Sequence, residues 1–228
     1  AFSHRITNIF SSKIANIVTA TALILSTVFC LYSTYGNEPI VDFRPYALGS
    51  DINEKMKEIE PAEVEYNFIY KNKGTGEEKE FDMNSIPTDT NWTYVDRKDN
   101  VINEGIPAPI NNLRFEDMSG NDVTHSLLNE EAESYWIVCY DINKTSMDAF
   151  NEKMLPFAKE MRAKGVNVYC MVGVSDANFD KKTGEVVDMV RADATPLKTM
   201  VRSNPGVLKI KKGVVVDKWH HRSFNGGK

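Results

Sequence analysis

The longest apolar run of the chain lies near its N-terminus. Residues 14–35 contain no charged side chain over 22 positions, and about 20 apolar residues suffice for a helix to cross a bilayer. The serines and threonines in the run can donate to the carbonyls of the helix itself. We therefore predict a transmembrane helix over 14–35. A cleaved signal peptide and a buried core helix are the alternatives, although no small-x-small cleavage site follows the run.

Charges on either side of this run predict its orientation. Arg5 and Lys13 precede it, whereas Glu38 and Asp42 follow it together with Arg44. Because positive residues favour the cytoplasmic side, residues 1–13 are predicted to form a cytoplasmic stub and the rest of the chain to lie outside. The aromatic and arginine side chains that come directly after the run (Phe43, Arg44, Tyr46) are expected to lie at the lipid headgroups.

Residues 36–107 are predicted to form a juxtamembrane linker and a β-rich segment. Apolar and polar residues alternate over 64–70, a glycine-containing turn follows at 73–76, and 77–81 then return as the second strand of a hairpin. Further short strands are expected at 92–96 and 101–105. The sequence Pro-Ala-Pro at 107–109 marks the end of the segment.

Residues 108–228 alternate between strand-like and helix-like patterns. The continuous apolar run 136–140 predicts a strand that is buried on both faces. Apolar residues then recur every three or four positions over 146–164, which predicts a helix kinked at Pro156, and a second strand is expected at 166–172. Strand, helix and strand in this order predict a βαβ unit with parallel strands.

The remainder of this region predicts a further strand at 186–190, a helix at 196–203 and an antiparallel pair of strands at 207–210 and 214–219. Residues 176–185 are polar and are predicted to form a turn, and 123–125 a short strand. The predicted fold class is therefore α/β, with a mixed sheet and flanking helices.

The net charge, the cysteines and the histidines limit the partners and the kinds of site that the sequence predicts. The net charge of −5 argues against a nucleic-acid partner, which requires a concentrated basic face. Cys139 and Cys170 lie in apolar strands and are expected to be buried thiols, although a disulfide between them stays conceivable. His220 and His221 are expected to point in opposite directions as a surface pair, so neither a metal site nor any other cofactor is predicted.

The segment around Pro205 resembles the cis-proline region of thioredoxin-like domains. Asn204-Pro205-Gly206 precedes the antiparallel pair of strands, and Pro156 is similar to the kinking proline of the family's first long helix. The resemblance covers about residues 108–221. It implies a cis Asn204–Pro205 bond and a binding groove, formed by Asp141, Asn143, Asp148, Asn204, Pro205 and Gly206.

The chain departs from this family where the reactive Cys-x-x-C would stand. Residues 141–148 read Asp-Ile-Asn-Lys-Thr-Ser-Met-Asp and contain no cysteine. These side chains can cap a helix but cannot exchange disulfides. The sequence therefore predicts a thioredoxin-like domain that is not a thiol oxidoreductase.

A second resemblance concerns residues 39–46 after the apolar run, the β-rich stretch and the closing 218–221. Together they resemble bacterial DoxX-type membrane proteins with a thioredoxin-like extension. The resemblance implies that the chain, which begins at Ala1 without a methionine, holds the last transmembrane helix and the extension of a longer protein. It implies a bacterial inner membrane, with the C-terminal domain in the periplasm.

The expected function is a membrane-anchored binding or structural module. Membrane lipid is one expected partner, and other helices of the same membrane protein or a periplasmic protein are the others. The alternative is an accessory subunit or fragment of a DoxX-type redox enzyme that uses Cys139 or Cys170.

Overall fold

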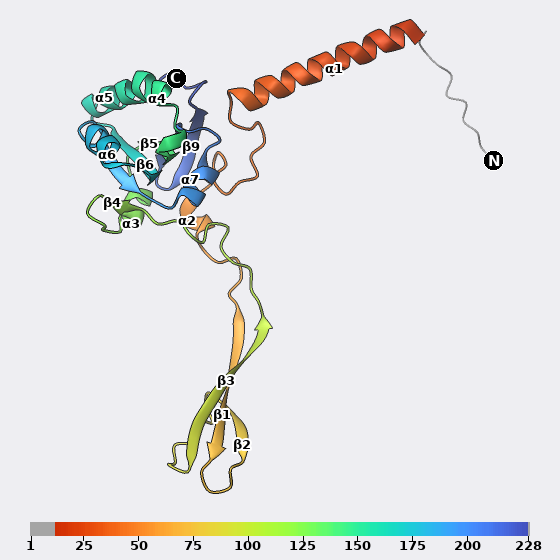
Figure 1. Cartoon of the computed structure of the whole chain (residues 1–228), viewed down its shortest axis with the longest axis vertical. Helices are drawn as coiled ribbons and strands as arrows, with labels where there is room; N and C mark the ends of the chain where they lie inside the picture. Colours follow the sequence, from red (N-terminus) through yellow and green to blue (C-terminus); the bar gives the residue numbers. More distant parts are fainter. Residues whose placement is uncertain (1–11, 228) are drawn as a thin grey trace, which may run out of the picture. The chain divides into compact units, whose positions relative to one another are not determined.

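The structure, a computed structural model, describes residues 12–227 in two compact units (Figure 1). The larger unit contains residues 12–53 and 112–227, and the smaller unit contains residues 54–111. Residues 36–53, which belong to the predicted juxtamembrane linker and β-rich segment at 36–107, thus cluster with the larger unit. Residues 1–11 of the predicted cytoplasmic stub lie outside the described residues.

The N-terminal helix α1 extends over Ser12–Tyr35. The hydroxyls of Thr19, Thr27 and Thr34 each donate to the carbonyl four residues earlier, which satisfies these polar groups inside the helix. None of its residues is buried, so the alternative of a buried core helix is wrong. By its length and composition α1 can cross a membrane or serve as a signal sequence.

The smaller unit contains a single antiparallel sheet in the order β2-β1-β3. Its strands are β1 (Glu63–Asn72), β2 (Glu78–Asp82) and β3 (Trp92–Asn103). The predicted hairpin of β1 and β2 is confirmed, and the two further strands predicted at 92–96 and 101–105 form one continuous strand. No residue of these three strands is buried.

The larger unit contains a six-stranded mixed sheet in the order β4-β7-β6-β5-β8-β9. β5, β6 and β7 are parallel, and β8 runs antiparallel to both β5 and β9. The predicted βαβ unit and mixed sheet are therefore confirmed. The strands are β4 (Glu116–Asp117), β5 (Ser134–Asp141), β6 (Asn167–Val174), β7 (Asp188–Arg191), β8 (Gly206–Lys211) and β9 (Val214–His220).

Both faces of the central strand β5 are buried, as its continuous apolar sequence predicts. Ile137 and Cys139 pack into one core together with Phe150 and Phe157. Trp136 points to the other face and contacts the Phe115 ring edge-on, with 5.1 Å between ring centroids. The helical segments are α2 (Ile52–Lys55), α3 (Thr124–Leu128), η1 (Ile142–Lys144), α4 (Met147–Ala149), η2 (Phe150–Met154), α5 (Leu155–Ala163), α6 (Ala177–Gly184) and α7 (Ala194–Met200).

The long helix predicted over 146–164 consists of α4, the π-helical turn η2 and α5. The π turn comes directly before Pro156, which has no amide hydrogen to donate to the preceding turn. Gly165 ends α5 with a φ of 77°, the left-handed conformation that glycine adopts at little cost.

Three other predictions are corrected. The polar segment 176–185 contains α6, because the Asp176 carboxylate accepts from the amides of Asn178 and Phe179 and caps the helix. Residues 123–125 belong mostly to α3 rather than to a strand. The helix predicted over 196–203 is α7, which ends at Met200 and is followed by an extended Val201 and by bends up to Pro205.

Candidate functional site

Asn204 joins two loops at one end of the larger sheet. Its Nδ2 donates to the carbonyl of Asp141 at 2.7 Å, and its Oδ1 accepts from the Thr145 hydroxyl at 3.0 Å. Its carbonyl accepts from the Ser146 amide at 2.8 Å. The peptide bond between Asn204 and Pro205 is cis, as the resemblance implies. One side chain thereby fixes the loop after β5 against the loop before β8.

The six predicted groove residues do not form one open surface. Asp141 and Asn143 lie at the loop that Asn204 contacts, but Pro205 and Gly206 are buried. A Cβ atom on Gly206 would stand 2.7 Å from Cγ2 of Val201, so this backbone is closely packed. Asp148 is exposed on α4. Of the six, Asn143 and Asn204 line the opening at these loops, and the other four are not among its lining residues.

A hollow of about 470 Å³ opens next to these loops, and we call it the basic hollow. Lys144, Arg202 and Arg222 supply its positive charge, and hydroxyl and amide groups of the two loops supply hydrogen-bonding atoms. No carboxylate is among the described residues that line it. Lys144 forms an ion pair with Asp141 at 2.8 Å, so the two arginines provide most of the uncompensated charge.

His220 and His221 also line the basic hollow. Their rings lie 4.5 Å apart and are inclined by only 31°, and His220 is buried. The prediction of a surface pair pointing in opposite directions is therefore wrong. Within the described part of the chain, no group of three or more histidine, cysteine, aspartate and glutamate residues is arranged to hold a metal ion.

Burial favours the neutral form of both imidazoles. It lowers the pKa of His220, and the neighbouring Arg222 guanidinium acts in the same direction. Burial, together with His220 and Arg222, lowers the pKa of His221 to about 4. Nδ1 of His221 is buried without a hydrogen-bond partner among residues 12–227, which is uncommon for a buried polar atom.

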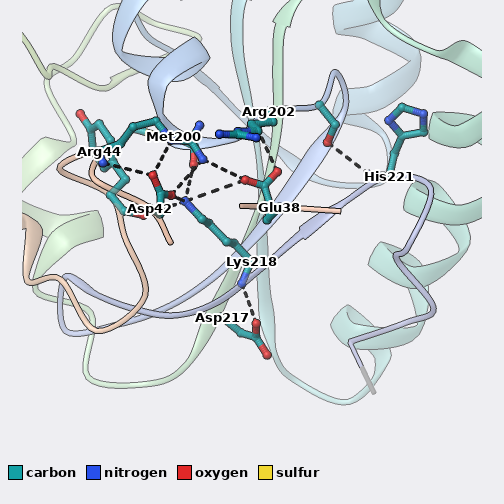
Figure 2. Close-up of polar contacts among 10 residues, drawn as sticks. Glu38, Asp42, Arg44, Met200, Arg202, Asp217, Lys218 and His221 are labelled. Carbon is teal, nitrogen blue, oxygen red and sulfur yellow. Dashed lines mark hydrogen bonds and ion pairs between the residues drawn. The ribbon is translucent and has the colours of Figure 1, made fainter. Parts of the chain in front are cut away.

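A cluster of four charged side chains lies next to Arg202, which lines the basic hollow (Figure 2). Glu38, Asp42 and Arg44 come from the segment after α1, and Lys218 comes from β9. We call these four residues the ion cluster. Lys218 Nζ donates to Asp42, to the Tyr46 carbonyl at 3.0 Å and to the Met200 carbonyl at 3.3 Å.

Arg44 holds the two carboxylates of the ion cluster, and Glu38 connects the cluster to the basic hollow. The Arg44 guanidinium contacts Asp42 at 2.8 Å and Glu38 at 3.0 Å. Glu38 also accepts from the backbone amide of Arg202 at 2.9 Å, and Figure 2 shows this bond beside the one from Lys218 to Asp42. The ion cluster therefore ties the segment after α1 to the chain that lines the hollow.

The ion cluster is balanced, with two positive and two negative groups. Burial raises the pKa of Asp42, but hydrogen bonds from Arg44 and Lys218 outweigh burial, and the net pKa lies well below its usual range. Burial lowers the pKa of Lys218, and Asp42 opposes this effect. Because each buried charge has a partner, removing any one would leave an uncompensated charge.

These contacts correct the prediction that Arg44 and Tyr46 lie at the headgroups. Tyr46 is 2% exposed and Arg44 belongs to the ion cluster, whereas Phe43 is 94% exposed. The sequence gives no local signal for this arrangement, because Lys218 follows Asp217 in its strand and its burial is not visible in the pattern. The carboxylates that neutralise this lysine lie far away in the sequence.

The two cysteines of the larger sheet are free and buried, as predicted. Cys139 on β5 and Cys170 on β6 are each 0% exposed. Burial, followed by the neighbouring Cys170, raises the pKa of the Cys139 thiol, which disfavours the reactive thiolate. Cys30 is exposed on α1.

A comparison with protein families finds a match outside this site. A family model described as a domain of unknown function (DUF8463) matches residues 64–104, which contain almost the whole sheet of the smaller unit. No curated protein matches the chain. The comparisons therefore give no function to the basic hollow or to the ion cluster.

Proposed function

We propose that the larger unit is a thioredoxin-like domain, carried on a membrane helix, that acts as a binding or structural module without thiol chemistry. The strand order supports the fold, since β5, a helix and β6 form a parallel unit and β8 and β9 form an antiparallel pair. The cis Asn204–Pro205 bond directly before β8 supports it as well.

The observation that carries this function is the hydrogen-bonded loop after β5. This loop stands where a thioredoxin-like oxidoreductase would hold its Cys-x-x-C, and it is fixed by Asn204 through Asp141, Thr145 and Ser146. Disulfide exchange needs an accessible thiolate. The larger sheet holds its two thiols buried in the core instead. A fixed, cysteine-free loop beside a polar hollow suits binding.

We further propose that the chain is the C-terminal part of a DoxX-type protein of the bacterial inner membrane. On this proposal α1 crosses the membrane and both units lie in the periplasm. Lipid, other helices of the same membrane protein or a periplasmic protein would be its partners. The uncharged residues 14–35 of α1 and the ion cluster that ties the following segment to the larger unit support an anchored arrangement.

The alternative is an accessory part of a DoxX-type redox enzyme. The observation in its favour is that Cys139 and Cys170 interact with each other on neighbouring strands. Oxidation of this pair would require the core to open, because both thiols are 0% exposed.

An insulin-reduction assay on the full chain in detergent micelles tests the proposal. With dithiothreitol as the reductant, we expect no rate above that of dithiothreitol alone. The matched control is the double substitution Asn143→Cys/Ser146→Cys, which introduces Cys-x-x-C at the start of α4 and should create activity. An active wild-type chain would favour the redox alternative. A folded but inactive double variant would contradict the thioredoxin-like assignment.

A further inference from the structure

Two hollows of opposite polarity meet at Arg222. The basic hollow lies on one side of this residue. On the other side is a crevice of about 810 Å³, lined on α1 mainly by Val28, Leu31, Tyr32 and Tyr35. We call it the apolar crevice. Arg222 lines both, so a charged surface continues directly into an apolar one.

Arg222 also contacts the end of α1. Its guanidinium donates to the Tyr35 carbonyl at 2.6 Å and stacks 3.7 Å from the centre of the Tyr35 ring. The last turn of α1 contains no basic residue, so Arg222 supplies the positive charge that favours a helix C-terminus. If α1 spans a membrane, Arg222 lies where the hydrocarbon ends and the headgroups begin.

The charge of the basic hollow selects the kind of ligand. Within residues 12–227, the Arg202 guanidinium has no hydrogen bond or ion pair, and no carboxylate lines the hollow. A group with net negative charge is therefore favoured there, and a quaternary ammonium is repelled.

We propose that the two hollows together bind one anionic phospholipid, whose phosphate contacts Arg202 and Arg222 and whose acyl chain lies against Leu31, Tyr32 and Tyr35. A phospholipid has the same abrupt change from charged to apolar, and arginine forms strong charge-assisted hydrogen bonds with phosphate. This inference rests on the proposed membrane placement of α1 but not on the thioredoxin-like assignment.

Native mass spectrometry of the delipidated full chain in detergent micelles tests this inference. The probes are dioleoylphosphatidylglycerol, dioleoylphosphatidylcholine and inorganic phosphate. We expect phosphatidylglycerol to bind about tenfold more tightly than phosphatidylcholine, and Arg202→Gln and Arg222→Gln each to weaken it by about tenfold, the value of one charge-assisted hydrogen bond. The matched control is Arg114→Gln, because Arg114 pairs with Glu116 and Asp122 and lines neither hollow. It should bind as the wild type does.

The outcomes distinguish a lipid headgroup from free phosphate as the ligand, and they distinguish a failure of this inference from a failure of the proposed function. Arg222→Gln also removes the contact with Tyr35, whereas Arg202→Gln leaves α1 untouched and so tests the headgroup alone. Equal binding of both lipids, or unchanged binding in Arg202→Gln, would overturn the inference. If inorganic phosphate binds as tightly as phosphatidylglycerol, the ligand of the basic hollow is a free anion and the lipid inference is overturned. Selective lipid binding by a chain that reduces insulin would leave this inference standing and refute the proposed function.

Discussion

The two units use aromatic side chains in different surroundings. In the larger unit, Phe115 meets Trp136 edge-on at 5.1 Å, and both are 0% exposed. In the smaller unit, Phe81 meets Trp92 edge-on at 5.2 Å, but no residue of the three strands is buried. The same ring geometry should therefore stabilise the larger unit more than the smaller one, because the stabilisation is proportional to the apolar area removed from water.

The charged groups show the same contrast. Lys218 and Asp42 pair where their side chains are 2% and 8% exposed. Lys71 and Glu78, in the smaller unit, pair at 3.4 Å with both side chains 53% exposed. Exposed pairs contribute little because water screens them, whereas a buried charge that loses its partner is costly. The comparison teaches that contacts in the larger unit should respond strongly to substitution and those in the small sheet weakly.

The largest expected effect is that of Phe115→Ala. Removing a fully buried ring should lower the free energy of unfolding of the larger unit by about 3–5 kcal/mol, because it leaves a cavity beside Trp136. Hydrogen exchange of amides in β5 and β6 measures this loss separately from the smaller unit. A loss below about 1 kcal/mol would contradict the expectation that the larger unit is more sensitive to substitution than the smaller unit.

Next in size is the effect of Lys218→Met on the ion cluster. The substitution leaves Asp42 and Glu38 with Arg44 as their only described positive partner, and should cost about 3 kcal/mol. Urea unfolding of the full chain in micelles, followed by tryptophan fluorescence, measures this cost. Lys211→Met, at an exposed position of β8, is the control and should change little. Equal stability of the two variants would show that the cluster is unimportant.

A smaller effect is expected from pH. The folded-state pKa of His221, about 4, lies below its ordinary value of 6.5, so the unfolded chain binds more protons between these values. Stability should therefore fall as pH decreases from 6.5 to 4, by about 1–2 kcal/mol after allowance for solvent screening. His220, whose pKa is also lowered, acts in the same direction.

Urea unfolding at several pH values measures this slope, and His221→Gln should reduce it. Asp42 provides an internal control, because its pKa is lowered in the folded state. Its contribution is present above the ordinary value of 3.8 and is lost only as pH falls below that value. An unchanged slope in His221→Gln between pH 4 and 6.5 would show that the imidazole is not held neutral.

The smallest expected effect is that of Phe81→Ala. Its ring is only partly buried and contacts Trp92 and Tyr70 across the strands, so the loss should be about 1 kcal/mol and confined to the smaller unit. Hydrogen exchange of β1 to β3 should accelerate while that of β5 and β6 stays unchanged. A loss as large as that of Phe115→Ala would indicate that another surface covers this sheet.

The sequence predicts the regular elements of the larger unit better than its site. The continuous apolar run of β5 and the periodic residues after it need only local information, and both are confirmed. The sequence contains the residue that caps α6, Asp176. The buried residues of α6 are only Phe179 and Thr183, so the apolar periodicity is too weak to predict a helix. The π turn before Pro156 depends on packing that local sequence does not encode.

The ion cluster and the basic hollow depend on distant parts of the chain. Lys218 and Asp42 are 176 positions apart, so the sequence shows each charge but not its partner. Strand alternation predicts opposite directions for the two histidines, but β9 ends at His220 and the alternation does not extend to position 221. The hydrogen bond between Asn204 and Asp141 joins two residues that only the resemblance, and no local pattern, places together.

A thiol count on the folded chain most directly tests the central claim, which is that the larger unit is a binding module without thiol chemistry and that its cysteines are buried and inert. The full chain with Cys30→Ser retains Cys139 and Cys170 and is treated with iodoacetamide before and after denaturation in urea. The account predicts that neither thiol is alkylated in the folded chain and that both are alkylated after unfolding without a reductant. Rapid alkylation of the folded chain, or thiols that appear only after reduction, would contradict it.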